Sequence, residues 1–236
     1  MRIPAMVILN YGFHQICLET DMINNYARIP APSAPGILSL LLLSFLFLAS
    51  PATAGSRNVN VAEMTSRAGR VIHGTVSEVR NGIHPQNPGI AVTFVKVQVL
   101  ETIKGASSRE VSFMQFGNST TQYATHLPRY SVGEEVVLFL YPESKLGLTS
   151  PVGEGQGKFT VKDDINTGRR ILVNEQLNQA VFSRLDANKM STRLGLTRAE
   201  RLTVVQSNEA NSRGLDLSSF RSIVRKLAAN PNADIQ

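Results

Sequence analysis

Six consecutive apolar residues, Val136-Val137-Leu138-Phe139-Leu140-Tyr141, stand immediately before Pro142. Successive side chains of a β-strand point to opposite faces of its sheet, so a strand built from this run is apolar on both faces. Such a strand is typical of the middle of a core, where both of its faces are covered. Proline lacks the backbone N–H of a sheet ladder, so the strand should end before Pro142. We therefore expect a β fold with this strand near its centre.

Other strand-like patterns occur on both sides of this run. They cover residues 71–79, 91–100, 111–116, 157–161 and 169–173. Residues 95–99 alternate between valine and a polar side chain, which predicts a long half-buried strand. Asn81-Gly82 and the Asn- and Gly-containing segment 163–168 favour hairpin turns. The series predicts a mainly β fold, a small antiparallel OB-like barrel, with a β sandwich as the alternative.

A short N-terminal helix and a helical C-terminal segment complete the expected fold. Asn60 followed three residues later by Glu63 is an N-cap pattern that predicts a short helix. After Asn174 the spacing of apolar residues becomes helical. It is seen at Leu177, Val181 and Leu185, and again at Leu217, Phe220, Ile223, Val224 and Leu227. We expect Asp216 or Ser218 to cap this last helix.

The positive charge of the chain is concentrated near its C-terminal end. The net charge is +6 and the pI is about 9.7. We expect residues 55–173 to form the β-barrel domain and residues 174–236 to form a basic helical tail that packs on it. Arg221, Arg225 and Lys226 are expected on the outer face of the last helix. There they would contact an anionic membrane surface or envelope polymer, or form only the solvated side of an amphipathic helix.

An uncharged apolar run covers residues 36–49 and is followed by Ala52-Thr53-Ala54 and then Gly55. This is the pattern of a signal peptide, in which small side chains such as Ala52 and Ala54 fit the signal peptidase. A membrane-spanning helix needs about 20 apolar residues, more than this run offers. We therefore expect residues 36–54 to be cleaved off between Ala54 and Gly55, with an uncleaved membrane anchor as the alternative. The mature chain would be periplasmic or extracellular and would have no transmembrane span.

Residues 1–35 do not fit the start of a signal peptide. They contain Glu19 and Asp21, whereas a signal peptide normally begins with basic residues a few positions before its apolar run. We expect an unstructured preamble whose first residues precede the true start; a start at Met22 would remove both acids. The one cysteine of the chain, Cys17, lies in this preamble, so no disulfide is expected in the mature chain.

Several short motifs resemble those of a group of uncharacterised bacterial secreted proteins. They are Arg67-Ala68, Gly74, the stretch 93–101 that leads to Lys104-Gly105, and Gly155-Gln156-Gly157-Lys158-Phe159. The resemblance covers residues 61–173 and implies export and fold, but no active site. More loosely, the strand around Gly74 and the Lys104-Gly105 end are similar to netrin-like and metalloproteinase-inhibitor domains, which are OB-type barrels. Those inhibitors use an N-terminal cysteine, which the expected mature chain lacks.

No motif of catalysis or metal binding stands out. His73, His84 and His126 do not have the spacing of a zinc site, and no Gly-x-Ser-x-Gly elbow occurs. We predict no catalytic, metal or cofactor residues and no nucleic-acid binding, and favour a non-catalytic exported module that binds an envelope or extracellular partner. The alternative is an exported hydrolase of unrecognised type. Its carboxylates would come from Glu134-Glu135 and Asp163-Asp164, although neighbours on a strand point to opposite faces.

The polar stretch 117–131 is the candidate contact surface, because a connection this long usually packs or binds something. Its candidate contact residues are Tyr123, His126, Arg129 and Tyr130. The competing interpretation is a surface crossover with Leu127 and Pro128 turned inward.

Overall fold

The computed structural model describes residues 57–118, 127–207 and 214–236. The chain divides into two units, residues 1–54 and 55–236, and every described residue belongs to the second. The expected preamble and signal peptide, with Ala52, Ala54 and Gly55, lie outside the described residues, as do Tyr123 and His126. No helix in the described part of the chain is long and apolar enough to cross a membrane.

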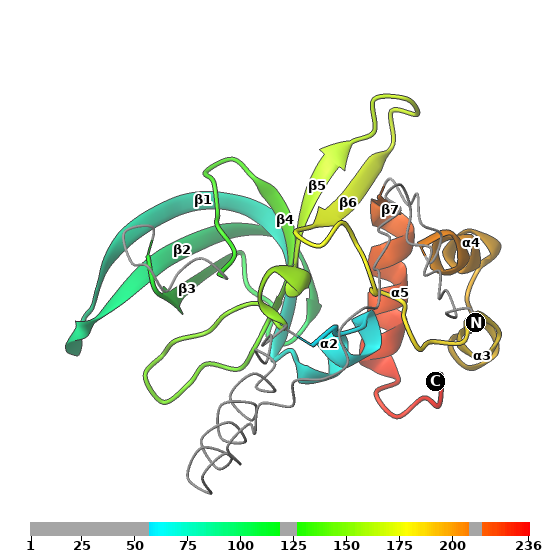
Figure 1. Ribbon diagram of the computed structural model, residues 1–236, viewed down its shortest axis with the longest axis horizontal. Coiled ribbons are helices and arrows are strands. Elements are labelled where there is room, and N and C mark those ends of the chain that lie inside the picture. Colours follow the sequence, from blue (N-terminus) through cyan, green and yellow to red (C-terminus); the bar gives the residue numbers. More distant parts are fainter. Residues whose placement is uncertain (1–56, 119–126, 208–213) are drawn as a thin grey trace, which may run out of the picture. The chain divides into compact units, whose positions relative to one another are not determined.

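One antiparallel sheet of seven strands organises this unit (Figure 1). Its strands are β1 (Arg70–His84), β2 (Asn87–Lys104), β3 (Glu110–Phe116), β4 (Glu135–Leu140), β5 (Lys158–Asp163), β6 (Arg170–Asn174) and β7 (Leu215–Asp216). Their order is β3-β2-β1-β4-β5-β6-β7, so β4 is the central strand as predicted. The fold is mainly β, but the sheet is open, so the expected barrel is not confirmed.

The two apolar faces of β4 belong to two separate cores. Val136, Leu138 and Leu140 pack with the side chains of β1, β2 and β3 in one core. Val137 and Phe139 point the other way, into a larger core shared with the helices. All five side chains are at most 3% exposed. The cores are built from residues 59–235, so this unit has the packing that a self-folding domain requires.

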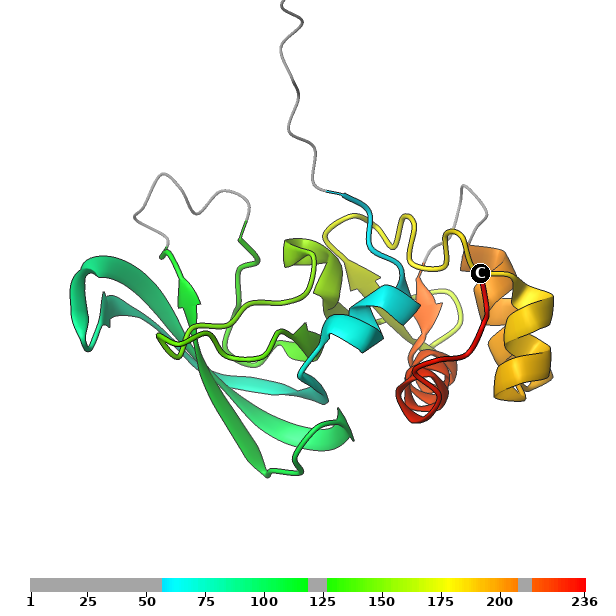
Figure 2. The ribbon, with the colours of Figure 1, turned by 90° about the horizontal axis from the view of Figure 1, so that it is seen from below.

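The described residues contain four α-helices on the second side of the sheet, and the last of them packs on several strands. The helices are α2 (Val61–Arg67), α3 (Ala187–Leu194), α4 (Arg198–Ser207) and α5 (Leu217–Ala229). The caps predicted at Asn60 and Asp216 are confirmed, because each side chain accepts a backbone N–H of the first helical turn. α5 buries its whole predicted stripe of apolar side chains. Figure 2 shows α5 between α2 on one side and α3 with α4 on the other.

The helix expected directly after Asn174 is absent, and residues 175–184 form a series of turns instead. Asn174 Oδ1 accepts the backbone N–H of Asn178, whose amide group in turn donates to the carbonyl of Leu172. Asparagine side chains that bond nearby backbone in this way compete with helical bonds. Residues 177, 178, 180 and 184 consequently have positive φ. The C-terminal segment also contributes β7, so it is not purely helical.

Candidate functional site

The predicted contact surface is only partly present in the described residues. Arg129 is exposed, but Tyr130 is only 8% exposed and packs edge-on against Phe113, with ring centroids 5.7 Å apart. Burial, reinforced by two carboxylates, raises the pKa of Tyr130 well above its usual value. The prediction for Tyr130 was therefore wrong, because its ring completes the core beside β3. Pro128 is buried, as the competing interpretation required.

The two neighbouring carboxylates of the alternative hydrolase do not converge. Glu134 Oε1 accepts from Lys158 Nζ at 2.5 Å and from Thr160 Oγ1 at 2.6 Å. Glu135 instead contacts His73 and Arg170 on the opposite face of the sheet. The expectation that adjacent strand residues point apart is thus confirmed. Within the described ranges, no group of three or more His, Cys, Asp and Glu side chains could hold a metal ion.

His73 of β1 connects β4 and α5, because its ring contacts one side chain from each of them. It is 2% exposed, with Nε2 2.6 Å from Glu135 Oε1 and Nδ1 2.9 Å from Arg221 Nη1. A guanidinium only donates, so Nδ1 must accept and the proton of His73 must lie on Nε2. Burial lowers the pKa of His73, the Glu135 hydrogen bond opposes this, and the charge of Arg221 adds to it.

The three cations expected to stand free on α5 are paired. Arg225 Nη2 lies 2.5 Å from Glu101 Oε1, and Arg221 Nε lies 3.3 Å from Oε2 of the same carboxylate without hydrogen-bond geometry. Lys226 Nζ lies 2.6 Å from Glu200 Oε2. The expectation of an open basic face at these residues was wrong, because β2 and α4 each bring a carboxylate against α5. Adsorption through Arg221, Arg225 and Lys226 stays a prediction.

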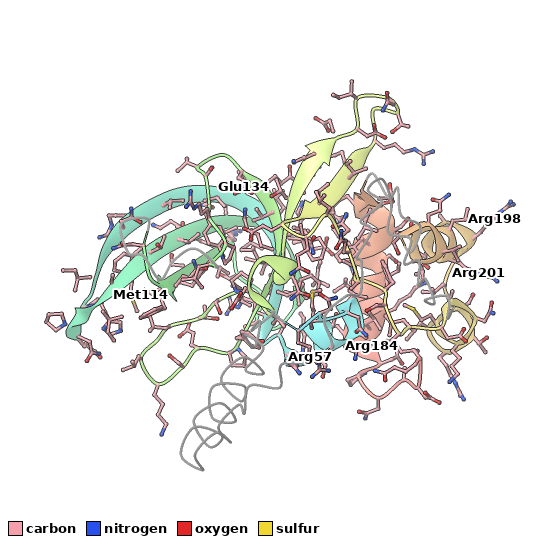
Figure 3. All side chains as sticks on the ribbon, viewed as in Figure 1. Arg57, Met114, Glu134, Arg184, Arg198 and Arg201 are labelled. Atoms are coloured by element: carbon pink, nitrogen blue, oxygen red, sulfur yellow. The ribbon has the colours of Figure 1, made fainter. Side chains whose placement is uncertain are left out.

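Cations that outnumber their acidic partners gather instead around α2, in what we call the guanidinium pocket. Three arginines share the single carboxylate of Glu63: Arg67 Nη2 at 2.5 Å, Arg57 Nη2 at 3.3 Å and Arg184 Nη2 at 3.6 Å. Lys104 lines the same cavity, which has a volume of about 750 Å³. Figure 3 shows Arg57 and Arg184 beside α2. Glu63 and Asp234 are the acidic side chains of the described lining, so the four cationic side chains outnumber them.

Local structure explains how these side chains meet. The Asn60 cap starts α2 so that Glu63 and Arg67 stand one turn apart. The backbone of the turns at residues 175–184 contacts the start of α2, because the N–H of Val61 donates to the carbonyl of Val181 at 2.7 Å. This bond brings Arg184 to the pocket. Lys104 Nζ donates to the carbonyl of Ala68 at 2.7 Å, and burial lowers the pKa of this lysine.

Sequence reasoning missed this pocket because its cations come from three distant segments. The helical spacing of Glu63 and Arg67 was a readable signal for one ion pair only. Nothing local links Arg57, Lys104 and Arg184.

Comparison with known proteins adds no function: no protein-family model and no curated protein matches the chain. The resemblances to bacterial secreted proteins and to netrin-like domains therefore stay predictions.

Proposed function

We propose that the chain is an exported, non-catalytic binding module whose guanidinium pocket receives an anionic group of its ligand. The observation that carries the proposal is the sharing of one carboxylate by three arginines. Each guanidinium has five N–H donors, and one carboxylate cannot occupy those of three. The side chains of Arg57 and Arg184 are 66% and 55% exposed, so their remaining donors are accessible.

The chemistry of the pocket favours a carboxylate or phosphate group. Planar guanidinium groups bind both in bidentate fashion. The cavity of about 750 Å³ is within the usual size of a ligand site, and Leu227, Ile235 and Ala62 give it apolar walls. A ligand with an acidic end and an apolar body, such as an acidic peptide of the cell envelope, fits this lining.

Export rests on the apolar run 36–49 and the Ala52-Thr53-Ala54 site behind it. N-terminal sequencing of the exported protein should then begin at Gly55. An OB-like arrangement of β1 to β4 is also part of the proposal. It is supported by a parallel bridge between Met114 and Leu148 and an antiparallel bridge between Leu140 and Pro151, which connect β3 and β4 through one segment.

The binding site is tested by titrating residues 55–236 with hexaglutamate and with inorganic phosphate, using calorimetry at low salt. Arg57→Ala with Arg184→Ala should weaken hexaglutamate binding about 10-fold or more, because two charge-assisted contacts are lost. Arg109→Ala with Lys162→Ala is the matched control, since it removes the same charge at exposed positions outside the pocket. Equal losses in both double variants would overturn the assignment. Turnover of an ester or peptide substrate that Glu134→Gln abolishes would overturn the non-catalytic reading.

A further inference from the structure

α4 has an unusual division of side chains between its two faces. The buried face carries Glu200, Thr203 and Val204. Leu202 and Val205 lie on the other face and are 46% and 45% exposed. A surface helix normally buries its aliphatic residues and exposes its acids. In α4 the acid is inside, held by Lys226, and two aliphatic side chains face solvent.

The outward face of α4 forms a continuous stripe. Arg198, Arg201, Leu202 and Val205 are spaced i, i+3, i+4 and i+7, which places them on one side of a helix. Figure 3 shows Arg198 and Arg201 extending from α4 away from the sheet. We call these four residues the α4 stripe.

Neither arginine of the α4 stripe forms an ion pair with an acid of the described residues, although Asp164 and Asp216 line the cavity beside Leu202. Arg201 donates to the neutral amide of Asn188 at 2.8 Å, and Arg198 makes no ion pair within the described ranges. Glu200, the one acid of α4, is turned inward. The adjoining α3 adds Arg193, which is exposed as well. The surface therefore combines open positive charge with exposed aliphatic side chains.

We propose that the α4 stripe docks on the surface of a bilayer containing anionic lipids. Arginine side chains can reach headgroup phosphates while aliphatic neighbours on the same helix face enter the acyl boundary. Charge complementarity selects anionic over zwitterionic lipid, and each arginine near such a surface contributes about 5-fold to partitioning. The stripe lies on α4 and shares no residue with the guanidinium pocket, so the two proposals stand or fall separately.

The test is co-sedimentation of residues 55–236 with phosphatidylcholine vesicles that contain about 30% phosphatidylglycerol, at about 0.1 M salt. Arg198→Glu with Arg201→Glu should lower the partition coefficient about 25-fold or more. Leu202→Ser with Val205→Ser should lower the partition coefficient about 5-fold at every salt concentration, because the insertion of aliphatic side chains does not depend on charge. All four side chains are exposed, so melting temperatures should change little.

Arg109→Glu with Arg129→Glu is the matched control, since both arginines are exposed and the change in net charge is identical. This variant should lose less than about 3-fold. A larger loss would overturn the proposal in favour of bulk charge attraction. Equal sedimentation with pure phosphatidylcholine, or no sedimentation at all, would also overturn it. The proposal would also be overturned if the protein bound hexaglutamate through Arg198 and did not bind vesicles. That result would make an acidic protein the partner of the α4 stripe.

Discussion

At the scale of single residues, His73 is the group whose protonation the fold restricts most clearly. Its Nδ1 accepts from Arg221 and its Nε2 donates to Glu135, so the neutral ring satisfies both contacts. A second proton on Nδ1 would face the guanidinium directly. The pKa of His73 is lowered, which agrees with the preference of this geometry for a neutral ring.

This arrangement predicts a loss of stability in mild acid. Below its usual pKa of 6.5 the unfolded chain takes up a proton on His73 while the native chain does not, so the free energy of unfolding falls as the pH decreases from there. Urea unfolding at about pH 7 and about pH 5 measures the difference. His73→Gln should cost about 1–3 kcal/mol at neutral pH and reduce the pH dependence. Identical pH dependence in both proteins would show that His73 titrates freely.

Charge reversal on α5 should lower the stability of the fold modestly. Arg225→Glu would place a second carboxylate beside Glu101, which Arg225 now contacts. Arg225 is partly exposed, so solvent limits the expected loss to about 1 kcal/mol. Adding Glu101→Arg should recover part of it in a double-mutant cycle. Lys162→Glu, at an exposed position without an ion pair in the described ranges, is the control and should change stability by less than about 0.5 kcal/mol.

At the scale of helices and strands, the local signals of capping residues were the most reliable, whereas the helical spacing of Leu177, Val181 and Leu185 was misleading. The caps of α2 and α5 and the stripe of α5 are each contained within one helix, and all were read correctly. α4 lies in the segment that was expected to be helical, but its own bounds were not predicted, although Thr197 and Glu200 form a capping box. The N–H of Thr197 donates to Glu200 Oε2 at 2.6 Å, and the N–H of Glu200 donates to Thr197 Oγ1. The exposed Leu202 and Val205 broke the apolar period that would have supported this signal.

Loss of the negative charge of Glu200 should strongly lower the stability of the fold. Burial raises the pKa of Glu200, but hydrogen bonds from Lys226, Ser222 and the N–H of Thr197 outweigh burial and lower the pKa to about 2. Because the native pKa lies below the usual 4.5, this stabilisation is present above about pH 4.5 and is lost as the pH falls toward 2. Glu200→Gln should cost about 3 kcal/mol at neutral pH.

Chemical unfolding at neutral pH checks this prediction, and an acid titration checks its pH range. Glu78→Gln provides the comparison, since its carboxylate is exposed and its nearest cation, Lys96 Nζ, is 3.7 Å away. That variant should lose no more than about 1 kcal/mol. Similar losses in the two variants would mean that Glu200 is not anchored as described.

The central strand should not accept a charge. Leu138 is fully buried between β1 and β5, so Leu138→Asp would leave an unpaired carboxylate in the core and unfold the domain. Leu100→Asp, at a strand position that is 63% exposed, should stay soluble and folded. Circular dichroism melting distinguishes the two. A cooperative, unshifted transition for Leu138→Asp would mean that β4 is not central.

At the scale of the whole described unit, the fold depends on pairings that no local pattern contains. β7 is two residues long and joins the sheet beside β6, more than forty positions away in sequence. The guanidinium pocket likewise combines Arg57, Lys104 and Arg184. Sequence periodicity identified most strands and the last helix, but packing of the complete chain determines which elements become neighbours.

The last prediction concerns the dependence of the sheet on α5. Phe220 of α5 lies against Phe159, with ring centroids 4.9 Å apart, and against Phe139 of the central strand at 6.2 Å. Ending the chain before Leu215 removes β7 and α5 together and exposes this face of the sheet. Each buried apolar side chain of α5 contributes about 1.5–3 kcal/mol, so the five of the predicted stripe together approach the whole stability of a typical domain.

We therefore expect the truncated chain to lose its cooperative thermal transition and to bind no hexaglutamate, because Leu227 and Ile235 of the pocket are removed as well. Phe220→Ala in the full unit should be milder, with a loss of about 3–5 kcal/mol. Thermal melting and amide hydrogen exchange measure both variants. If the truncated chain melts cooperatively at an unchanged temperature, residues 57–207 have a sufficient core of their own and α5 is an accessory helix.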